Sequence, residues 1–134
     1  MIQKTKMSKR LERLKETAYK EALKSNGIHR HGAIVLGNGG RILAKACNNY
    51  DNGCHAEVRA LKRVPHDAKE CAVAIIVVRA RRNQRFGLSR PCVACQAALK
   101  AANIDVVYYS TNNETLEYET FHENEHRPVF IEGH

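Results

Sequence analysis

Hydrophobic and polar residues near the start of the chain alternate with the period of an amphipathic helix. Apolar residues recur there at spacings of three and four, with Lys, Arg and Glu between them, at Leu11, Leu14, Ala18 and Ala22. The pattern predicts a helix over residues 8–25 that packs one apolar face against the rest of the protein.

The segments that follow show the patterns of strands. Two short apolar runs, residues 32–36 and 41–46, flank a turn rich in Gly and Asn and predict a β-hairpin. The near-continuous apolar run 72–78 predicts a strand that is covered on both faces.

Two further strands are predicted near the end of the chain, over residues 104–109 and 115–121. They are separated by about five residues, whereas a parallel crossover takes a dozen or more. If they pair with each other, they must therefore run antiparallel.

Two more helices are predicted between the strands. Residues 55–64 place Val58, Leu61 and Val64 on one helical face and are followed by Pro65. Residues 92–102 follow Pro91, which is favoured at the start of a helix. The Arg-rich segment before Pro91 is predicted to be a loop.

Helices that alternate with strands predict an α/β fold, a three-layer α-β-α sandwich around a mixed sheet of about five strands. A length of 134 residues fits a single domain over residues 1–134. Its core is expected over about 28–121, after the basic helix 8–25 and before a polar tail at 122–134.

The net charge of +8 is unevenly distributed. Residues 1–31 hold nine Lys and Arg against three Glu, residues 79–90 hold five Arg and no acid, and residues 114–134 hold six Glu against one Arg. The basic helix and the Arg79–Arg90 loop suit a phosphate on a small nucleotide or a nucleic-acid backbone. A merely solvated charged surface explains the same pattern equally well.

The cysteines and the longest apolar run bear on location. The five cysteines are an odd number, and no apolar leader precedes them, so a reducing, cytoplasmic location is expected. The longest apolar run, residues 71–78, is far shorter than the ~20 residues of a membrane helix, so no membrane partner is expected.

Three residues at two predicted helix starts have the character of a catalytic zinc site. Such a site takes three protein ligands of the N and S type and leaves its fourth position to water. His55 begins one helix, and the pair Cys92-x-x-Cys95 begins another. Glu57, two residues after His55, is then placed to accept a proton from a water that zinc has acidified to a pKa of about 7.

The motif His55-Ala56-Glu57, followed by Pro91-Cys92-Val93-Ala94-Cys95, resembles the cytidine and deoxycytidylate deaminase superfamily. The resemblance covers roughly residues 28–110. It implies a cytidine deaminase-like fold, with zinc held by His55, Cys92 and Cys95. It also implies that Glu57 shuttles protons while hydroxide attacks the carbon that bears the amine.

The resemblance also implies substrate contacts. Asn48 stands where these enzymes commonly contact the substrate through an Asn side chain, and the backbone N–H of Ala56 commonly contacts the carbonyl of the base. Arg90, beside the zinc cysteines in the sequence, is a further candidate. Many relatives assemble and complete the pocket from a neighbouring subunit, so a homo-oligomer is expected.

Some features depart from the family. Cys47 replaces a usual aromatic residue, and the loop 48–55 is shorter than in deoxycytidylate and transfer-RNA deaminases. An antiparallel last strand resembles the free-nucleoside enzymes, whereas the spelling His-Ala-Glu is less common in those enzymes. The size of the substrate therefore stays open.

The leading hypothesis is a zinc-dependent hydrolase that deaminates a cytosine-type nucleoside or nucleotide and releases ammonia. Its rival within the same chemistry is deamination of a purine base or of a base within RNA or single-stranded DNA. From another class, the chain would be a non-catalytic nucleic-acid-binding module with structural zinc, its fourth ligand supplied by Cys47, Cys54 or Cys71. His29 and His31 precede the first strand of the hairpin and could line the pocket, although surface or packing roles are more common.

Overall fold

The computed structural model describes residues 2–4, 8–49, 55–82 and 85–121. Within these residues, seven strands form one mixed sheet in the order β1-β7-β6-β4-β2-β3, with β5 paired to β4 off this path. The strands are β1 (Ile2–Lys4), β2 (Arg30–Leu36), β3 (Ile42–Cys47), β4 (Ala74–Ala80), β5 (Phe86–Gly87), β6 (Val106–Ser110) and β7 (Leu116–Thr120). The predicted tail 122–134 and Cys54 lie outside the described residues.

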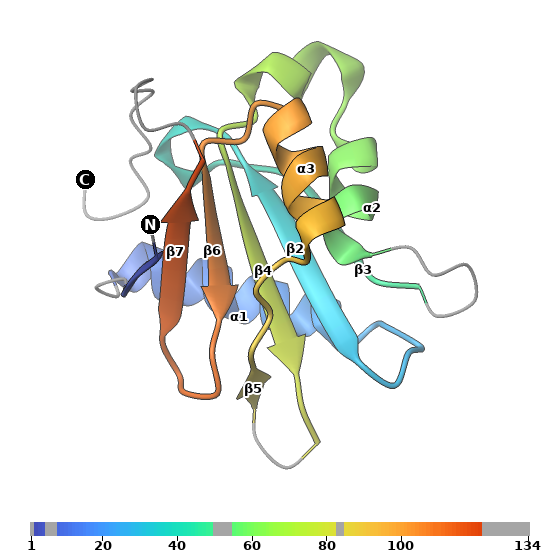
Figure 1. The fold of residues 1–134 in the computed structure, drawn as a ribbon, viewed down its shortest axis with the longest axis vertical. Helices are drawn as coiled ribbons and strands as arrows, with labels where there is room; N and C mark the ends of the chain where they lie inside the picture. The colour runs from blue at the N-terminus through green and yellow to red at the C-terminus, as the bar shows by residue number, and fades with distance from the viewer. Residues whose placement is uncertain (1, 5–7, 50–54, 83–84, 122–134) are drawn as a thin grey trace.

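Helices cover both faces of the sheet, as Figure 1 shows. Helix α1 (Lys9–Ala22) lies on one face, and α2 (Ala56–Arg63) and α3 (Val93–Ala101) lie together on the other. Short 3₁₀ turns, η1 (Asn38–Gly40) and η2 (His66–Cys71), complete the described elements. The predicted α/β class and three-layer architecture are confirmed.

The neighbours of each strand confirm the predicted topology. The pairs β2–β3, β2–β4 and β6–β7 are antiparallel, and β4–β6 is parallel. The predicted hairpin is thus β2–β3, and the last strand runs antiparallel to its neighbour. Strands β1 and β5 add to the expected sheet, and β5 lies in the Arg-rich segment that was predicted to be a loop.

Helix α1 begins where the sequence indicates. The hydroxyl oxygen of Ser8 accepts a hydrogen bond from the backbone N–H of Leu11 at 3.1 Å, which satisfies one of the free donors of the first turn. All four residues of the predicted apolar face are buried against the sheet. Among the described residues, no helix is long and apolar enough to cross a membrane.

The buried face of α2 differs from the predicted one. Ala56, Glu57 and Ala60 are the buried residues, whereas Val58 and Leu61 are only partly buried. The small alanine side chains pack onto the sheet, and Val58 and Leu61 instead line a cavity of about 260 Å³. The periodicity of the large side chains predicted the helix correctly, and of the three residues on that face only Val64, at the end of the helix, is buried.

Gly32 in β2 sets the distance between the sheet and α1. A Cβ atom at this position would lie 2.3 Å from the carbonyl oxygen of Ala18 and 2.5 Å from the backbone nitrogen of Ala22. Both atoms belong to the helix backbone, so no side chain can move aside to make room. Any larger residue at position 32 must therefore push α1 away from the sheet.

We expect Gly32→Ala to lower the free energy of unfolding by about 3 kcal/mol, because overpacking against rigid backbone displaces a helix. The matched control is Gly37→Ala, since position 37 is extended and its nearest backbone neighbour would be an ordinary 3.4 Å away. Urea denaturation of both variants checks this. Equal losses in the two variants would contradict the close-approach argument.

Candidate active site

The starts of α2 and α3 meet on one face of the sheet. His55 is the N-cap residue of α2, and Cys92 is the N-cap residue of α3. Cys95 follows in the first turn of α3 and is buried, with 2% of its surface exposed. Helix α2 follows β3, and the segment that leads to α3 leaves the end of β4 and passes through β5; β3 and β4 run in the same direction, since each is antiparallel to β2. The site therefore lies beyond the carboxyl ends of these strands, the usual place for ligands in α/β sheets.

The three ligand atoms lie close enough together to hold one metal ion. The sulfur of Cys95 is 3.0 Å from Nδ1 of His55, and the sulfur of Cys92 is 3.9 Å from the same nitrogen. All three atoms lie within 4.8 Å of one another. Tetrahedral zinc, with metal–ligand distances of about 2.0–2.3 Å, places its ligands roughly 3.5–4 Å apart. The nitrogen and sulfur donors are of the kind that zinc prefers, and of the two sulfur–nitrogen separations one lies in this range and the other below it.

The number of ligands favours a catalytic rather than a structural metal. In the described part of the chain, His55, Cys92 and Cys95 are the one group of three or more potential ligands. Cys47 and Cys71, also described, are free cysteines outside this group. Structural zinc is almost always held by four protein ligands, whereas catalytic zinc takes three and keeps an open position.

The surroundings of Cys95 call for a cation. Burial, followed by the nearby carboxylate of Glu57, raises the pKa of the Cys95 thiol. In the protein alone this effect outweighs the preference for thiolate that a helix N-terminus gives to a cysteine. A divalent ion reverses it, because a coordinating thiol loses its proton outright.

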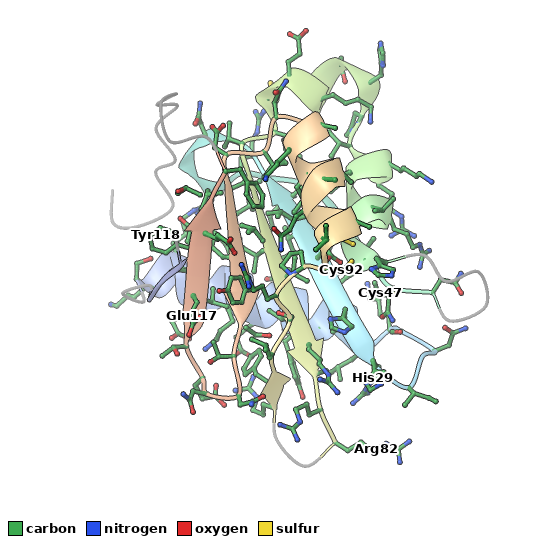
Figure 2. The ribbon with its side chains drawn as sticks, in the orientation of Figure 1. His29, Cys47, Arg82, Cys92, Glu117 and Tyr118 are labelled. Atoms are coloured by element: carbon green, nitrogen blue, oxygen red, sulfur yellow. The ribbon has the colours of Figure 1, made fainter. Side chains whose placement is uncertain are left out.

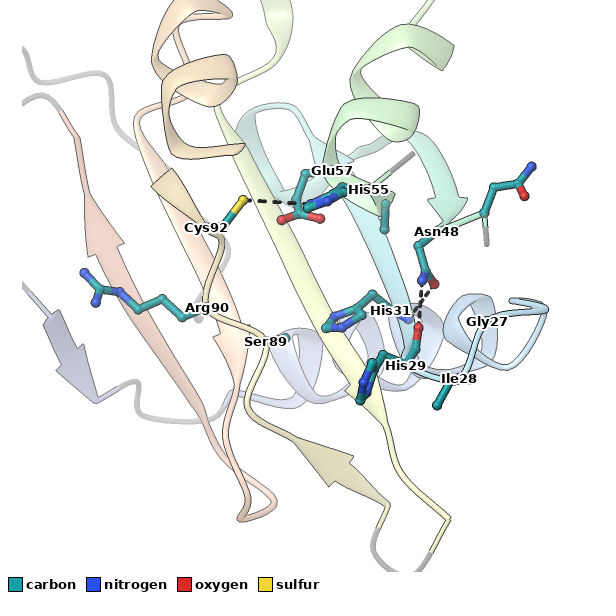
Figure 3. Close-up of a pocket in the computed structure, with 12 residues that line it drawn as sticks. Gly27, Ile28, His29, His31, Asn48, His55, Glu57, Ser89, Arg90 and Cys92 are labelled. Atoms are coloured by element: carbon teal, nitrogen blue, oxygen red, sulfur yellow. Dashed lines mark hydrogen bonds between the residues drawn. The ribbon is translucent and has the colours of Figure 1, made fainter. Parts of the chain in front are cut away.

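A pocket of about 480 Å³ opens beside the three ligands, and Figure 3 shows the residues that line it. This pocket, called the site pocket below, is large enough for a small organic ligand. Its lining residues are Gly27, Ile28, His29, His31, Asn48, Asn49, His55, Ala56, Glu57, Ser89, Arg90 and Cys92.

Glu57 has the properties of a proton-transfer group. It is 6% exposed and lies in the wall of the site pocket, next to His55 in Figure 3. Burial raises its pKa, while hydrogen bonds from its own backbone N–H and from Cys95 and the charge of His55 act in the opposite direction. A carboxyl group with a raised pKa exchanges protons nearer neutral pH than an exposed glutamate does.

The sequence model of the cytidine and deoxycytidylate deaminase zinc-binding region matches residues 8–111, which include the whole metal cluster. The chain belongs to this family. The protein is therefore a zinc-binding deaminase, and its family consists of zinc-dependent hydrolytic enzymes.

Solved cytidine deaminases share the fold. The enzyme from Burkholderia pseudomallei is 20% identical with a TM-score of 0.60, over 78% of this chain and 87% of that chain. A mutant of the Mycobacterium tuberculosis enzyme is 19% identical with a TM-score of 0.53, over 69% and 76% of the two chains. Among curated proteins, no sequence relative matches this deaminase.

Asn48 borders the site pocket, where its side chain fastens the chain segment that leads into β2. Its amide oxygen accepts a hydrogen bond from the backbone N–H of His31 at 2.8 Å, and its amide nitrogen donates to the carbonyl of His29 at 2.7 Å. Asn48 thus shapes the pocket, whatever contact it also makes with a substrate.

The other two candidate contacts differ in orientation. Ala56 is the first residue of α2 and lines the site pocket, and its backbone N–H is one of the donors at the helix start that have no partner within the helix. Arg90 lines the pocket, but its guanidinium points away toward β7 (Figure 3). It donates two hydrogen bonds, of 3.0 and 2.9 Å, to the carboxylate of Glu119.

Ser89 is a pocket residue that the sequence analysis missed. Its buried hydroxyl group lies 2.9 Å from that of Ser110 and donates to the carbonyl of Val77 at 2.7 Å. The Ser110 hydroxyl in turn donates to the carbonyl of Gly87. These contacts fix the segment before Cys92 to β4 and β6. No sequence signal identifies them, because the two serines are distant in the chain.

His31 also lines the pocket, and here the sequence held a signal. It lies two residues before Ala33 in β2, and Ala33 packs on the α2–α3 side of the sheet. The period of two in a strand puts His31 on the same side. Burial, followed by the charge of Arg79, lowers the pKa of His31 to about 4, so its ring is neutral at physiological pH.

We expect Cys92→Ser to lose most of its zinc, because it removes one of three ligands. The matched control is Cys71→Ser, since both cysteines are exposed and Cys71 lies outside the metal cluster. Elemental analysis of the purified proteins should find about one zinc per chain in the parent and in the control. Full zinc content in Cys92→Ser would refute this ligand assignment.

The contact between Arg90 and Glu119 predicts a pH dependence of stability. The hydrogen bonds from Arg90 hold the pKa of Glu119 below its usual range. The contact therefore stabilises the fold above the unfolded pKa of about 4.3, and this contribution is lost as the pH falls through the lower folded value.

Glu119→Gln should accordingly lower the free energy of unfolding at pH 7, and should make its decline between about pH 5 and 3 shallower than in the parent. Urea denaturation across this range measures both effects. Glu70→Gln, at an exposed position on η2, is the control. Curves for Glu119→Gln and the parent that stay parallel would show that the ion pair contributes nothing.

Proposed function

We propose that this deaminase hydrolyses the amino group of a cytosine-type base in a nucleoside or nucleotide and releases ammonia. The observation that carries the proposal is the position of Glu57. This buried carboxyl group lies in the wall of a pocket that is also lined by the metal ligands His55 and Cys92, with the third ligand, Cys95, buried beside them.

The residues of the site have distinct tasks in this reaction. His55, Cys92 and Cys95 would hold the zinc ion, which when bound lowers the pKa of a water molecule enough to make it a nucleophile at neutral pH. Glu57 takes a proton from the attacking water and delivers it to the ring nitrogen beside the reacting carbon. It then moves a second proton to the departing amine, so that ammonia leaves and a carbonyl oxygen remains on the base.

The N–H group of Ala56 is placed to orient the base. A donor at the start of α2 suits the carbonyl oxygen that a cytosine ring carries beside its reacting edge. Asn48 holds the pocket segment 29–31 in place and has a further lone pair for a sugar hydroxyl. Arg90 would have to leave Glu119 to reach a substrate in the pocket.

Two features support a small substrate over a polynucleotide. Strand β7 runs antiparallel to β6, the arrangement that resembles free-nucleoside enzymes. The basic helix α1 lies on the opposite face of the sheet from the site pocket, so it cannot guide a nucleic-acid strand into it (Figure 1).

Assembly into a homo-oligomer is a further part of the proposal. Of the large hydrophobic side chains that are exposed in the described residues, Ile28, Leu88 and Val93 lie in or next to the pocket-lining segments in sequence. A second copy of the chain would cover such a rim. Sedimentation analysis should then find a species larger than the monomer.

We expect Glu57→Gln to keep its zinc and fold while losing at least about 10³-fold in kcat, since the amide cannot carry protons. Ammonia release measures turnover, and elemental analysis measures zinc. Asp67→Asn, an exposed acid on η2, is the control and should retain parental activity.

The substrate panel consists of free bases, nucleosides, nucleotides and oligonucleotides of cytosine and of adenine and guanine. Turnover restricted to the purines or to oligonucleotides would overturn the proposed substrate class. The non-catalytic binding module would be favoured if the zinc-loaded parent released ammonia from no substrate of the panel and if Glu57→Gln bound nucleic acid as well as the parent does.

A further inference from the structure

Two basic residues, Arg79 and His31, lie on the same side of the sheet as the metal cluster. Arg79 in β4 is directly opposite His31 in β2. The neighbouring pair, Ala33 two residues after His31 and Val77 two residues before Arg79, is buried on the α2–α3 side. Since alternate residues of a strand share a face, Arg79 and His31 lie on this same side, just past the end of the hydrophobic core. The site pocket lies there.

Arg79 donates a hydrogen bond to His29, with its Nη2 atom 2.9 Å from Nδ1 of the ring. A guanidinium group can only donate, so Nδ1 of His29 must accept, and the proton of the neutral ring resides on Nε2. His29 lines the site pocket and lies near His31 in Figure 3. The pair formed by Arg79 and His29 therefore carries one positive charge and presents further N–H donors.

Arg79 differs from Arg85 and Arg90 in its electrostatic partner. Arg85 forms an ion pair with Glu16, and Arg90 forms one with Glu119. Among the described residues, no carboxylate forms an ion pair with Arg79, and Glu57 is the one acid that lines the pocket. Within the described residues, the positive charge of Arg79, which contacts the pocket residue His29, is therefore not neutralised by a neighbouring acid.

From this arrangement we infer that Arg79 and His29 form a subsite for the phosphate of a nucleoside monophosphate. The inference rests on the proposed function and specifies its substrate. A guanidinium and an imidazole N–H give charge-assisted hydrogen bonds to phosphate oxygens. One such pair, with His29 in the pocket wall and Arg79 bonded to it, suits a single phosphate, whereas a polynucleotide requires a row of basic groups. The enzyme would then prefer a nucleotide, although its last strand, β7, runs antiparallel as in the enzymes that act on free nucleosides.

The test compares cytidine with cytidine 5′- and 3′-monophosphate in the parent, Arg79→Ala and Arg82→Ala. Arg82 carries the same charge, is exposed, and lies away from His29 in Figure 2. Arg79→Ala should lower kcat/KM for a monophosphate roughly 10- to 100-fold, chiefly through KM, because it removes hydrogen bonds to a charged group. It should change the value for cytidine by less than about twofold, and Arg82→Ala should affect neither substrate.

Binding provides a readout that does not depend on turnover. In the Glu57→Gln variant, calorimetry should give a lower Kd for the monophosphate than for cytidine. Adding Arg79→Ala should abolish this difference. Inorganic phosphate should compete with the monophosphate in the parent and not in Arg79→Ala. Equal losses for cytidine and monophosphate, or no loss for either, would overturn the subsite while leaving the deaminase proposal intact.

Failure of the proposed function has a different signature, namely no ammonia from either substrate by a zinc-loaded parent. An effect of Arg79→Ala that is confined to an oligonucleotide substrate would also overturn the subsite, because the phosphate would then belong to a strand.

Discussion

The whole arrangement depends on β4, a strand that is buried on both faces and paired along both edges. Ile76 and Val78 pack toward α1, whereas Ile75 and Val77 pack toward α2 and α3. Such a strand cannot slip by one residue, because a slip would exchange the two sets of side chains and place Arg79 in the core under α1. The fixed register of β4 therefore decides on which side of the sheet the chemistry takes place. It also places the polypeptide segment that leads to Cys92.

Much of the fold could be predicted because its long elements obey a simple period. Leu11 and Leu14 mark one face of α1, and the continuous apolar run of β4 indicates burial on both sides. The short strands β1 and β5 escaped prediction because two or three residues show no period. The rotation of α2 escaped because its contact with the sheet is made by alanines, which mark a helix face weakly.

The metal cluster could be predicted because its residues form a local motif at two helix starts. The pocket around it could not, since it is made by contacts between distant segments. Arg90 was expected to face a substrate, but Glu119, which lies 29 residues further along the chain, holds its guanidinium. Likewise, Ser89 and Ser110 meet only because β4 and β6 are parallel neighbours. The charge pattern therefore identified an arginine-rich segment next to the pocket but not the direction in which each arginine points.

A metal ion bound between the two helix starts would also restrict the conformations of the unfolded chain. His55 and Cys92 are 37 residues apart, and the segment between them contains α2 and β4. A cross-link of this span restricts the unfolded chain and raises its free energy by about 4 kcal/mol through lost conformational entropy. An ion that joins these ligands would cross-link the α2–α3 layer of the sandwich, whereas the α1 layer is held by packing together with hydrogen bonds and ion pairs such as that of Glu16 with Arg85. Catalytic competence and cohesion of the α2–α3 layer would then be gained and lost together.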